Sequence, residues 1–243
     1  MTTIASGVEL LSEIRRELQN AISPSYVTTA PDWSLYEVYN FCLVVEEASE
    51  AGANLAFRNS NDTPATTYVF RTRPSAITAL DPYTYALLSF NNKKPLEVHV
   101  GVFVSEKSME RIQCDVLVID RSEAEFFRQR RIRRSQNKAP RYWPDSSKIV
   151  LAIECKYLSN DMKSDESHEF VGRSQALRPT HSYLVTNTLS TAAGHRVLAN
   201  SNLKKNSAWQ HEIVPSRAPS VNRFRGVLRQ VFDNYISDTN NMS

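Results

Sequence analysis

The stretches 148–158 (KIVLAIECKYL) and 114–120 (CDVLVID) decide the fold of this 243-residue chain. Each is a nearly continuous apolar run, which is typical of a strand covered on both faces. Both are therefore predicted to be central strands of a sheet. Each also carries charges that such a strand rarely holds. Asp115 begins the shorter stretch, and Glu154 and Lys156 follow five apolar residues in the longer one.

The rest of the sequence predicts alternating helices and strands. Apolar periodicity predicts a helix over 32–51, with Asp32 or Ser34 as its N-cap and Gly52 as the left-handed residue that ends it. Runs of aromatic and β-branched residues predict a meander of strands, with a hairpin loop at 91–95. The fold class is therefore expected to be α/β, an α+β sandwich with a mixed central β-sheet flanked by helices. The other expected strands are 54–57, 66–71, 83–90, 96–104, 181–187 and 211–214, and the other expected helices are 122–128, 167–177, 191–200 and 220–235.

The length favours one domain over the whole of 1–243, since domains of roughly 100–200 residues are typical. An N-terminal helix and a connection are expected at 1–31, and a strand-rich insertion at 53–94. The core that carries the charged strands is expected at 95–215, followed by a C-terminal helix and tail at 216–243. Apolar residues at helical spacing predict the first helix, namely Val8, Leu11, Ile14 and Leu18.

The composition is that of an ordinary globular protein, with 41% hydrophobic and 23% charged residues. A net charge of +3 is too small to indicate a polyanionic partner by itself. No apolar run approaches the roughly 20 residues that cross a bilayer, so no membrane partner is expected. Cys42, Cys114 and Cys155 lack metal-ligand spacing, and their odd number cannot form a complete set of disulfides, so a reducing, cytoplasmic compartment is predicted. We expect Cys114 and Cys155 to pack in the core and to point away from the neighbouring charges.

The charged residues of the two central strands are the candidate site. Glu154 and Lys156 are two apart on a strand, so their side chains leave the same face. If the two strands are neighbours, Asp115 can meet Glu154 across the ladder at roughly 5 Å. Two carboxylates suit Mg²⁺, which binds one or two of them together with waters and a phosphate, and Mn²⁺ is expected to substitute. Lys156 can then orient or deprotonate the attacking water.

These residues resemble a known family, the PD-(D/E)XK or restriction-endonuclease-like nucleases. The match lies at Asp115 in CDVLVID and at Glu154-Cys155-Lys156 in AIECKYL. The pattern is most similar to the type IV restriction nuclease and Holliday-junction resolvase branches. In those branches a helix bearing a glutamate precedes the metal-binding strands, and here Glu37 holds that position.

The resemblance covers about 34–214 and includes the polar end of a later strand, LVTN at 184–187. The chain departs from the family pattern in a long insertion over 54–94 and in the absence of a proline before Asp115. These departures bear on the subfamily more than on the fold. The resemblance implies that Asp115, Glu154, Lys156 and Glu37 are the catalytic residues.

Each of these residues also has a structural explanation. Glu154 and Lys156 could form an ion pair on the face of a sheet, and Glu37 could be an ordinary acid on a helix surface. Glu97 shares a strand face with His99 and could add a metal ligand if its strand lies beside the first central strand. A solvent-facing pair is the alternative for these two.

Basic residues are candidate contacts to nucleic-acid phosphates. A run of arginines between the two central strands would neutralise several phosphates and give salt-sensitive affinity. Most such runs are solvated faces, which is the alternative here. On the helix after the second central strand, Arg173 and Gln175 could touch a substrate backbone, and surface exposure explains them equally well. The run comprises Arg128, Arg130, Arg131, Arg133 and Arg134.

The expected function is that of a metal-dependent endonuclease that hydrolyses DNA phosphodiester bonds, in restriction, antiphage defence or repair. A homodimer or larger homo-oligomer is the expected assembly, and RNA is a second possible substrate. Two alternatives stay open. One is a nuclease-fold protein that has lost turnover and serves as a nucleic-acid-binding or scaffold protein, and the other is an RNA-directed or ligand-regulated nuclease effector.

Overall fold

Seven α-helices and seven strands make up the part of the chain that the computed structural model describes, which is 6–78, 82–105, 111–134, 144–203 and 206–241, with the backbone alone at 130–134. The helices are α1 (Gly7–Glu17), α2 (Pro24–Thr29), α3 (Asp32–Glu50), α4 (Arg121–Arg134), α5 (Ser164–Leu177), α6 (Ala192–Ala199) and α7 (Ala218–Ser237), with short 3-10 turns at Ser146–Lys148 and Thr239–Asn241. The strands are β1 (Asn54–Asn59), β2 (Thr84–Ser89), β3 (Leu96–Ser105), β4 (Arg111–Asp120), β5 (Ile149–Lys156), β6 (His181–Thr186) and β7 (Ser207–Gln210).

The strands form one mixed sheet whose spatial order, β1 to β7, is also their order in the sequence. Neighbours run antiparallel from β1 to β5, whereas the pairs β5–β6 and β6–β7 are parallel. Parallel neighbours need a crossover connection, and α5 and α6 supply the two that are required. A mixed sheet flanked by helices confirms the α/β fold class.

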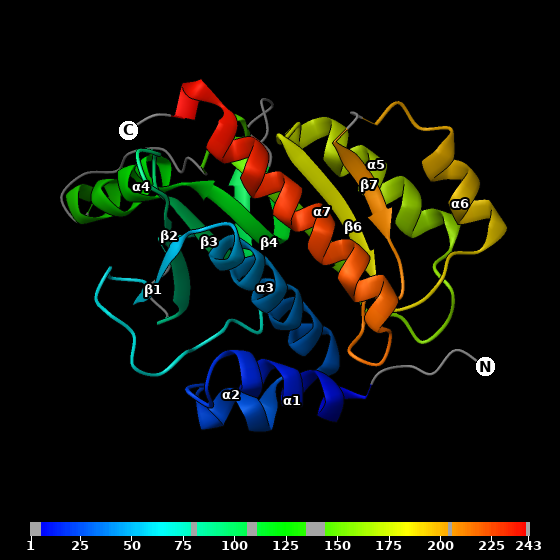
Figure 1. The fold of residues 1–243 in the computed structure, drawn as a ribbon, viewed down its shortest axis with the longest axis horizontal. Coiled ribbons are helices and arrows are strands. Elements are labelled where there is room, and N and C mark those ends of the chain that lie inside the picture. The colour runs from blue at the N-terminus through cyan, green and yellow to red at the C-terminus, as the bar shows by residue number, and fades with distance from the viewer. Residues whose placement is uncertain (1–5, 79–81, 106–110, 135–143, 204–205, 242–243) are drawn as a thin grey trace.

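Helices cover both faces of the sheet. On one face, α3 and α7 cross the strands, and the main hydrophobic core lies between them and residues such as Val116, Val118 and Ile153 (Figure 1). The alternate residues of the same strands, including Leu117 and Ala152, belong to a second core that contains Leu177 of α5. The central strands are therefore covered on both sides, as their continuous apolar runs predict.

Helix α3 lies almost entirely inside the protein, with 14 of its 19 residues buried. It begins after Pro31, which provides no side-chain cap, so the predicted capping by Asp32 or Ser34 is wrong. Its predicted end is confirmed, because Gly52 adopts a φ of +95° directly after the last turn. Any charged residue on this helix must therefore find a partner inside the protein or carry the cost of burial.

A charged cluster joins α3 to α7. Glu47 is 2% exposed and accepts hydrogen bonds from Arg225 at 3.0 Å and from Arg229 at 2.8 and 3.0 Å. Arg225 also reaches Glu46 at 2.6 Å. The two helices that cover the main core are thus held together across their contact, which fixes α3 against the sheet.

Several predicted elements differ from the structure. The segment 66–71 is not a strand, although Phe70 is buried, and the predicted strand over 211–214 is a loop whose neighbour Ser207–Gln210 pairs with β6 instead. Helix α4 extends to Arg134, beyond the predicted end at 128, and the short α2 was not predicted. Among the helices of the described ranges, none has the length and apolarity needed to span a bilayer.

Candidate active site

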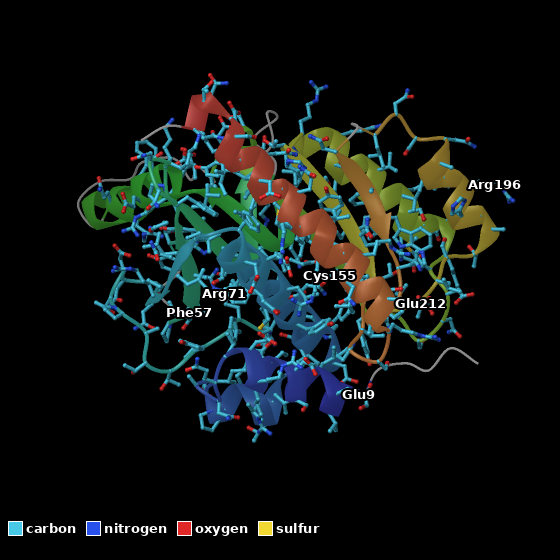
Figure 2. The ribbon with its side chains drawn as sticks, in the orientation of Figure 1. Glu9, Phe57, Arg71, Cys155, Arg196 and Glu212 are labelled. Carbon is cyan, nitrogen blue, oxygen red and sulfur yellow. The ribbon has the colours of Figure 1, made fainter. Side chains whose placement is uncertain are left out.

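The candidate site lies where strands β4 and β5 separate. Their ladder ends at the pair Val116 and Ile153, one residue before Asp115 and Glu154 would have faced each other. We call the place where the two strands separate the fork. The side chain of Asp115 bridges it, because Oδ2 accepts a hydrogen bond from the backbone amide of Cys155 at 2.8 Å. Cys155 lies near the middle of the molecule (Figure 2). The expected site thus forms around a carboxylate that replaces a strand-to-strand bond.

Asp115 is held in place, but no described cation forms a direct ion pair with it. Its Oδ1 accepts a hydrogen bond from Gln113 Nε2 at 2.7 Å, and its side chain is 5% exposed. Burial raises the pKa of Asp115, and the hydrogen bonds from Cys155 and Gln113 and the charges of Lys156 and Arg173 oppose that rise without cancelling it. The carboxylate is therefore oriented by neutral donors and remains short of positive charge.

Glu37 brings a second buried carboxylate from α3. It is 6% exposed, and no hydrogen bond or ion pair connects it to any other described residue. Burial, with the charge of Asp115 as a second cause, raises the pKa of Glu37 to about 9. The alternative of a surface acid is therefore wrong, and the structure brings Glu37 and Asp115 into the same environment.

Four charged side chains form a ring beside this pair. Lys156 Nζ lies 3.0 Å from Glu154 Oε1 and 2.7 Å from Glu169 Oε2. Arg173 completes the ring, since Nη2 lies 2.5 Å from Glu169 Oε1 and Nη1 lies 3.5 Å from Glu154 Oε1. Positive and negative groups alternate around it, so the ring as a whole is neutral.

The ring determines the charge states of Glu154 and Lys156. Burial raises the pKa of Glu154 in spite of Lys156 and Arg173, and Asp115 adds to the rise. Burial alone would lower the pKa of Lys156, but the carboxylates of Glu154 and Glu169 outweigh it and raise that pKa. Lys156 is therefore an ammonium at neutral pH, a state that suits orientation and charge stabilisation rather than proton abstraction.

A small cavity of about 20 Å³ adjoins Glu154 under α5, with room for a single water. Cys114 and Arg173 are among its lining residues. Cys114 packs in the second hydrophobic core, as expected, but it also borders the cavity beside Glu154, so it does not lie wholly away from the site. Burial raises the pKa of this thiol, with Asp115 and Glu154 adding to the rise, so it remains uncharged. Cys155 packs against the main core, as expected.

The fit of this site to a divalent cation rests on its carboxylates. Within the described residues, no group of three or more His, Cys, Asp or Glu side chains is close enough together to hold a metal. Mg²⁺ does not need so many, because it binds through one or two carboxylates with waters and phosphate as the other ligands. Asp115, Glu154 and Glu37 supply oxygen donors, and burial is the main cause that raises the pKa of each of them.

Glu97 does not join this site. It faces Ile119 in the β3–β4 ladder, four residues beyond Asp115, which is roughly 13 Å along the strand. Both of its oxygens are already engaged, by two nitrogens of Arg128 and by His99 at 3.0 Å. The expectation of a metal ligand at Glu97 is therefore corrected to a buried structural cluster, and the same bonds show that Arg128 is held inside the protein.

The other candidate phosphate contacts lie in different places. Arg173 belongs to the charged ring, and Gln175, two residues further along the same helix, is exposed. The arginine run falls on the second half of α4, so its backbone is helical, but four of its side chains lie outside the described residues, namely Arg130, Arg131, Arg133 and Arg134.

The sequence alone does not identify Glu169 and Gln113 as residues of the site. Glu169 stands four residues before Arg173, a spacing that predicts an ion pair on one helix face, and this was the only available signal. Gln113 lies two residues before Asp115, so the two side chains share a strand face. Both residues act on the site through a neighbour, which a sequence pattern for ligands does not capture.

Comparisons of the chain with protein-family models, with curated proteins and with solved structures found no match.

Proposed function

We propose that this protein is a metal-dependent endonuclease that hydrolyses phosphodiester bonds of DNA. One observation carries the proposal. At the fork between β4 and β5, the carboxylates of Glu37 and Asp115 are both buried and interact electrostatically, and among the described residues no ion pair joins either of them to a cation. The ammonium of Lys156 acts on Asp115 through its charge. Such an arrangement is costly to folding, and strongly perturbed acids of this kind mark functional sites.

The residues have distinct roles in this proposal. Asp115 and Glu154 would hold a divalent cation, and Glu37 would accept hydrogen bonds from waters around it. When bound, the cation polarises the scissile phosphate and stabilises the leaving oxygen. Lys156 keeps its proton and orients the attacking water or the phosphate through its charge. Arg173 stands beside Glu154 and can contact a neighbouring phosphate.

The direct test is a cleavage assay with purified protein. Plasmid DNA, single-stranded DNA and RNA are incubated with Mg²⁺, with Mn²⁺ or with EDTA, and the products are resolved by electrophoresis. We expect cleavage of DNA that requires the divalent ion. Asp115→Ala and Lys156→Ala should each lose cleavage by about 100-fold or more while folding and nucleic-acid binding persist.

Asp161→Ala is the matched control, because Asp161 is an exposed acid in the loop after β5. Undiminished cleavage by Asp115→Ala would remove the assignment of the site. Binding of DNA without cleavage under every metal condition would favour the alternative of a nuclease-fold protein that has lost turnover. Cleavage of RNA alone would correct the substrate class.

A further inference from the structure

The charged ring contains one carboxylate that the proposed chemistry does not use. Glu169 is on α5, opposite Glu154, and Lys156 lies between the two carboxylates at 2.7 and 3.0 Å. The side chain of Glu169 is 40% exposed, whereas that of Glu154 is 8% exposed. The ammonium is thus shared between a buried carboxylate and a more exposed one.

Sharing of this kind matters when Glu154 has a second use. A divalent cation bound to the Glu154 carboxylate weakens the hold of that carboxylate on Lys156, because the cation takes up its negative charge and repels the ammonium. The side chain of Lys156 is only 21% exposed, so water alone compensates poorly for the lost partner. A second carboxylate already at 2.7 Å keeps the ammonium paired and leaves Glu154 available.

We propose that Glu169 is a positioning residue that retains Lys156 at the site and releases Glu154 for a divalent cation. This inference rests on the proposed function, since it assigns a partner exchange to the same site. Arg173 supports the arrangement, because it pairs with Glu169 at 2.5 Å and stands further from Glu154, at 3.5 Å. In this proposal Glu169 touches neither the divalent cation nor the substrate, and it acts through its paired side chains, chiefly Lys156.

The test is a double-mutant cycle read out by binding of Mn²⁺ alone, measured by titration calorimetry without nucleic acid. Without Glu169, Glu154 is the one described carboxylate that still pairs with Lys156, so the ammonium competes with the cation for it. Glu169→Gln should therefore weaken Mn²⁺ binding by about tenfold, a typical size for coupling between residues in one ion network. With Lys156→Gln as background, the competitor is gone and Glu169→Gln should weaken binding by less than about threefold.

Asp161→Asn removes one exposed negative charge nearby in the sequence and should leave Mn²⁺ binding unchanged. Circular dichroism confirms that each variant is folded. Equal losses in both backgrounds would overturn the role of Glu169 while leaving the metal site intact, because they would reflect general charge and not the exchange of a partner. Absence of Mn²⁺ binding by the unmodified protein would instead overturn the proposed function, and this inference with it.

Discussion

Two buried carboxylate clusters stand at different places in this protein and are built in opposite ways. Glu97 on β3 is 0% exposed and has a full set of donors in His99 and Arg128. Glu37 on α3 is 6% exposed and faces another acid, Asp115, with no donor of its own among the described residues. The two glutamates are buried to nearly the same degree, and the difference between them lies in their partners.

The partners reverse the effect of burial on the acids. Burial would raise the pKa of Glu97, but the hydrogen bonds from His99 and Arg128 outweigh it, and the pKa is lowered. Burial raises the pKa of Glu37 to about 9, and Asp115 adds to the rise. A buried acid is therefore a sign of function only when its counter-charge is missing from the fold, since a paired acid is sufficiently explained by structure.

The largest effect is expected from breaking the paired cluster. Glu97→Ala leaves the guanidinium of Arg128 and the ring of His99 buried without their common acceptor. We expect a loss of about 3–5 kcal/mol in the free energy of unfolding, as for other broken buried ion pairs. Urea unfolding followed by circular dichroism measures it.

Glu50→Ala provides the control for this prediction. Glu50 is on α3, its side chain is 63% exposed, and its nearest cation, on Arg229, is 3.8 Å away. A change within about 0.5 kcal/mol is expected, as for most exposed ion pairs. A similar small change for Glu97→Ala would mean that the cluster does not hold β3 and α4 together, and the contrast between the two carboxylates would lose its basis.

An intermediate effect of opposite sign is expected from Glu37→Gln. An acid whose pKa is raised in the folded state stabilises the protein fully below its unfolded pKa, near 4.5, and loses that contribution as the pH rises through about 9. Glutamine cannot ionise, so the variant escapes this loss. Relative to the variant, the unmodified protein should lose about 1–3 kcal/mol of stability between pH 5 and pH 9.

Unfolding curves collected across this pH range for both proteins give the comparison directly. Parallel pH profiles would show that Glu37 ionises as easily in the folded chain as in the unfolded one. In that case Glu37 would not lack counter-charge, and the main support for a cation site at the fork would be removed.

The sequence predicts those elements whose apolar pattern matches the burial of their residues in the structure. The two central strands are predictable because a short, continuous apolar run is typical of a strand covered on both faces. The sequence does not predict strand β7, because its residues are SAWQ, whereas the apolar pair Ile213 and Val214 enters the core from a loop. Burial of apolar residues therefore does not identify a strand unless the ladder partner is also known.

The sequence likewise predicts only part of the candidate site. Asp115, Glu154 and Lys156 stand out because charges interrupt apolar strands. Glu97 looked similar, but its distance from Asp115 depends on strand register, which a single sequence does not fix. Glu169 cannot be predicted for a different reason. It is an acid on a polar helix, and its role depends on Lys156 of strand β5, to which it is paired in the folded protein.

The smallest effect on stability is expected from Asp115→Asn, and it isolates the repulsion between the two unpaired acids. Asparagine can still accept the hydrogen bond from the amide of Cys155, and the lost charge removes the repulsion on Glu37, so the free energy of unfolding should change by less than about 1 kcal/mol.

The pKa of Glu37 should fall in this variant, because one cause of its rise is removed, yet it should stay above the ordinary value because burial remains. A carbon-13 NMR titration of the Glu37 carboxyl in both proteins follows this shift. An identical titration would show that burial alone raises the pKa, in which case the two carboxylates do not share one electrostatic environment and the fork holds two separate acids rather than a site for one cation.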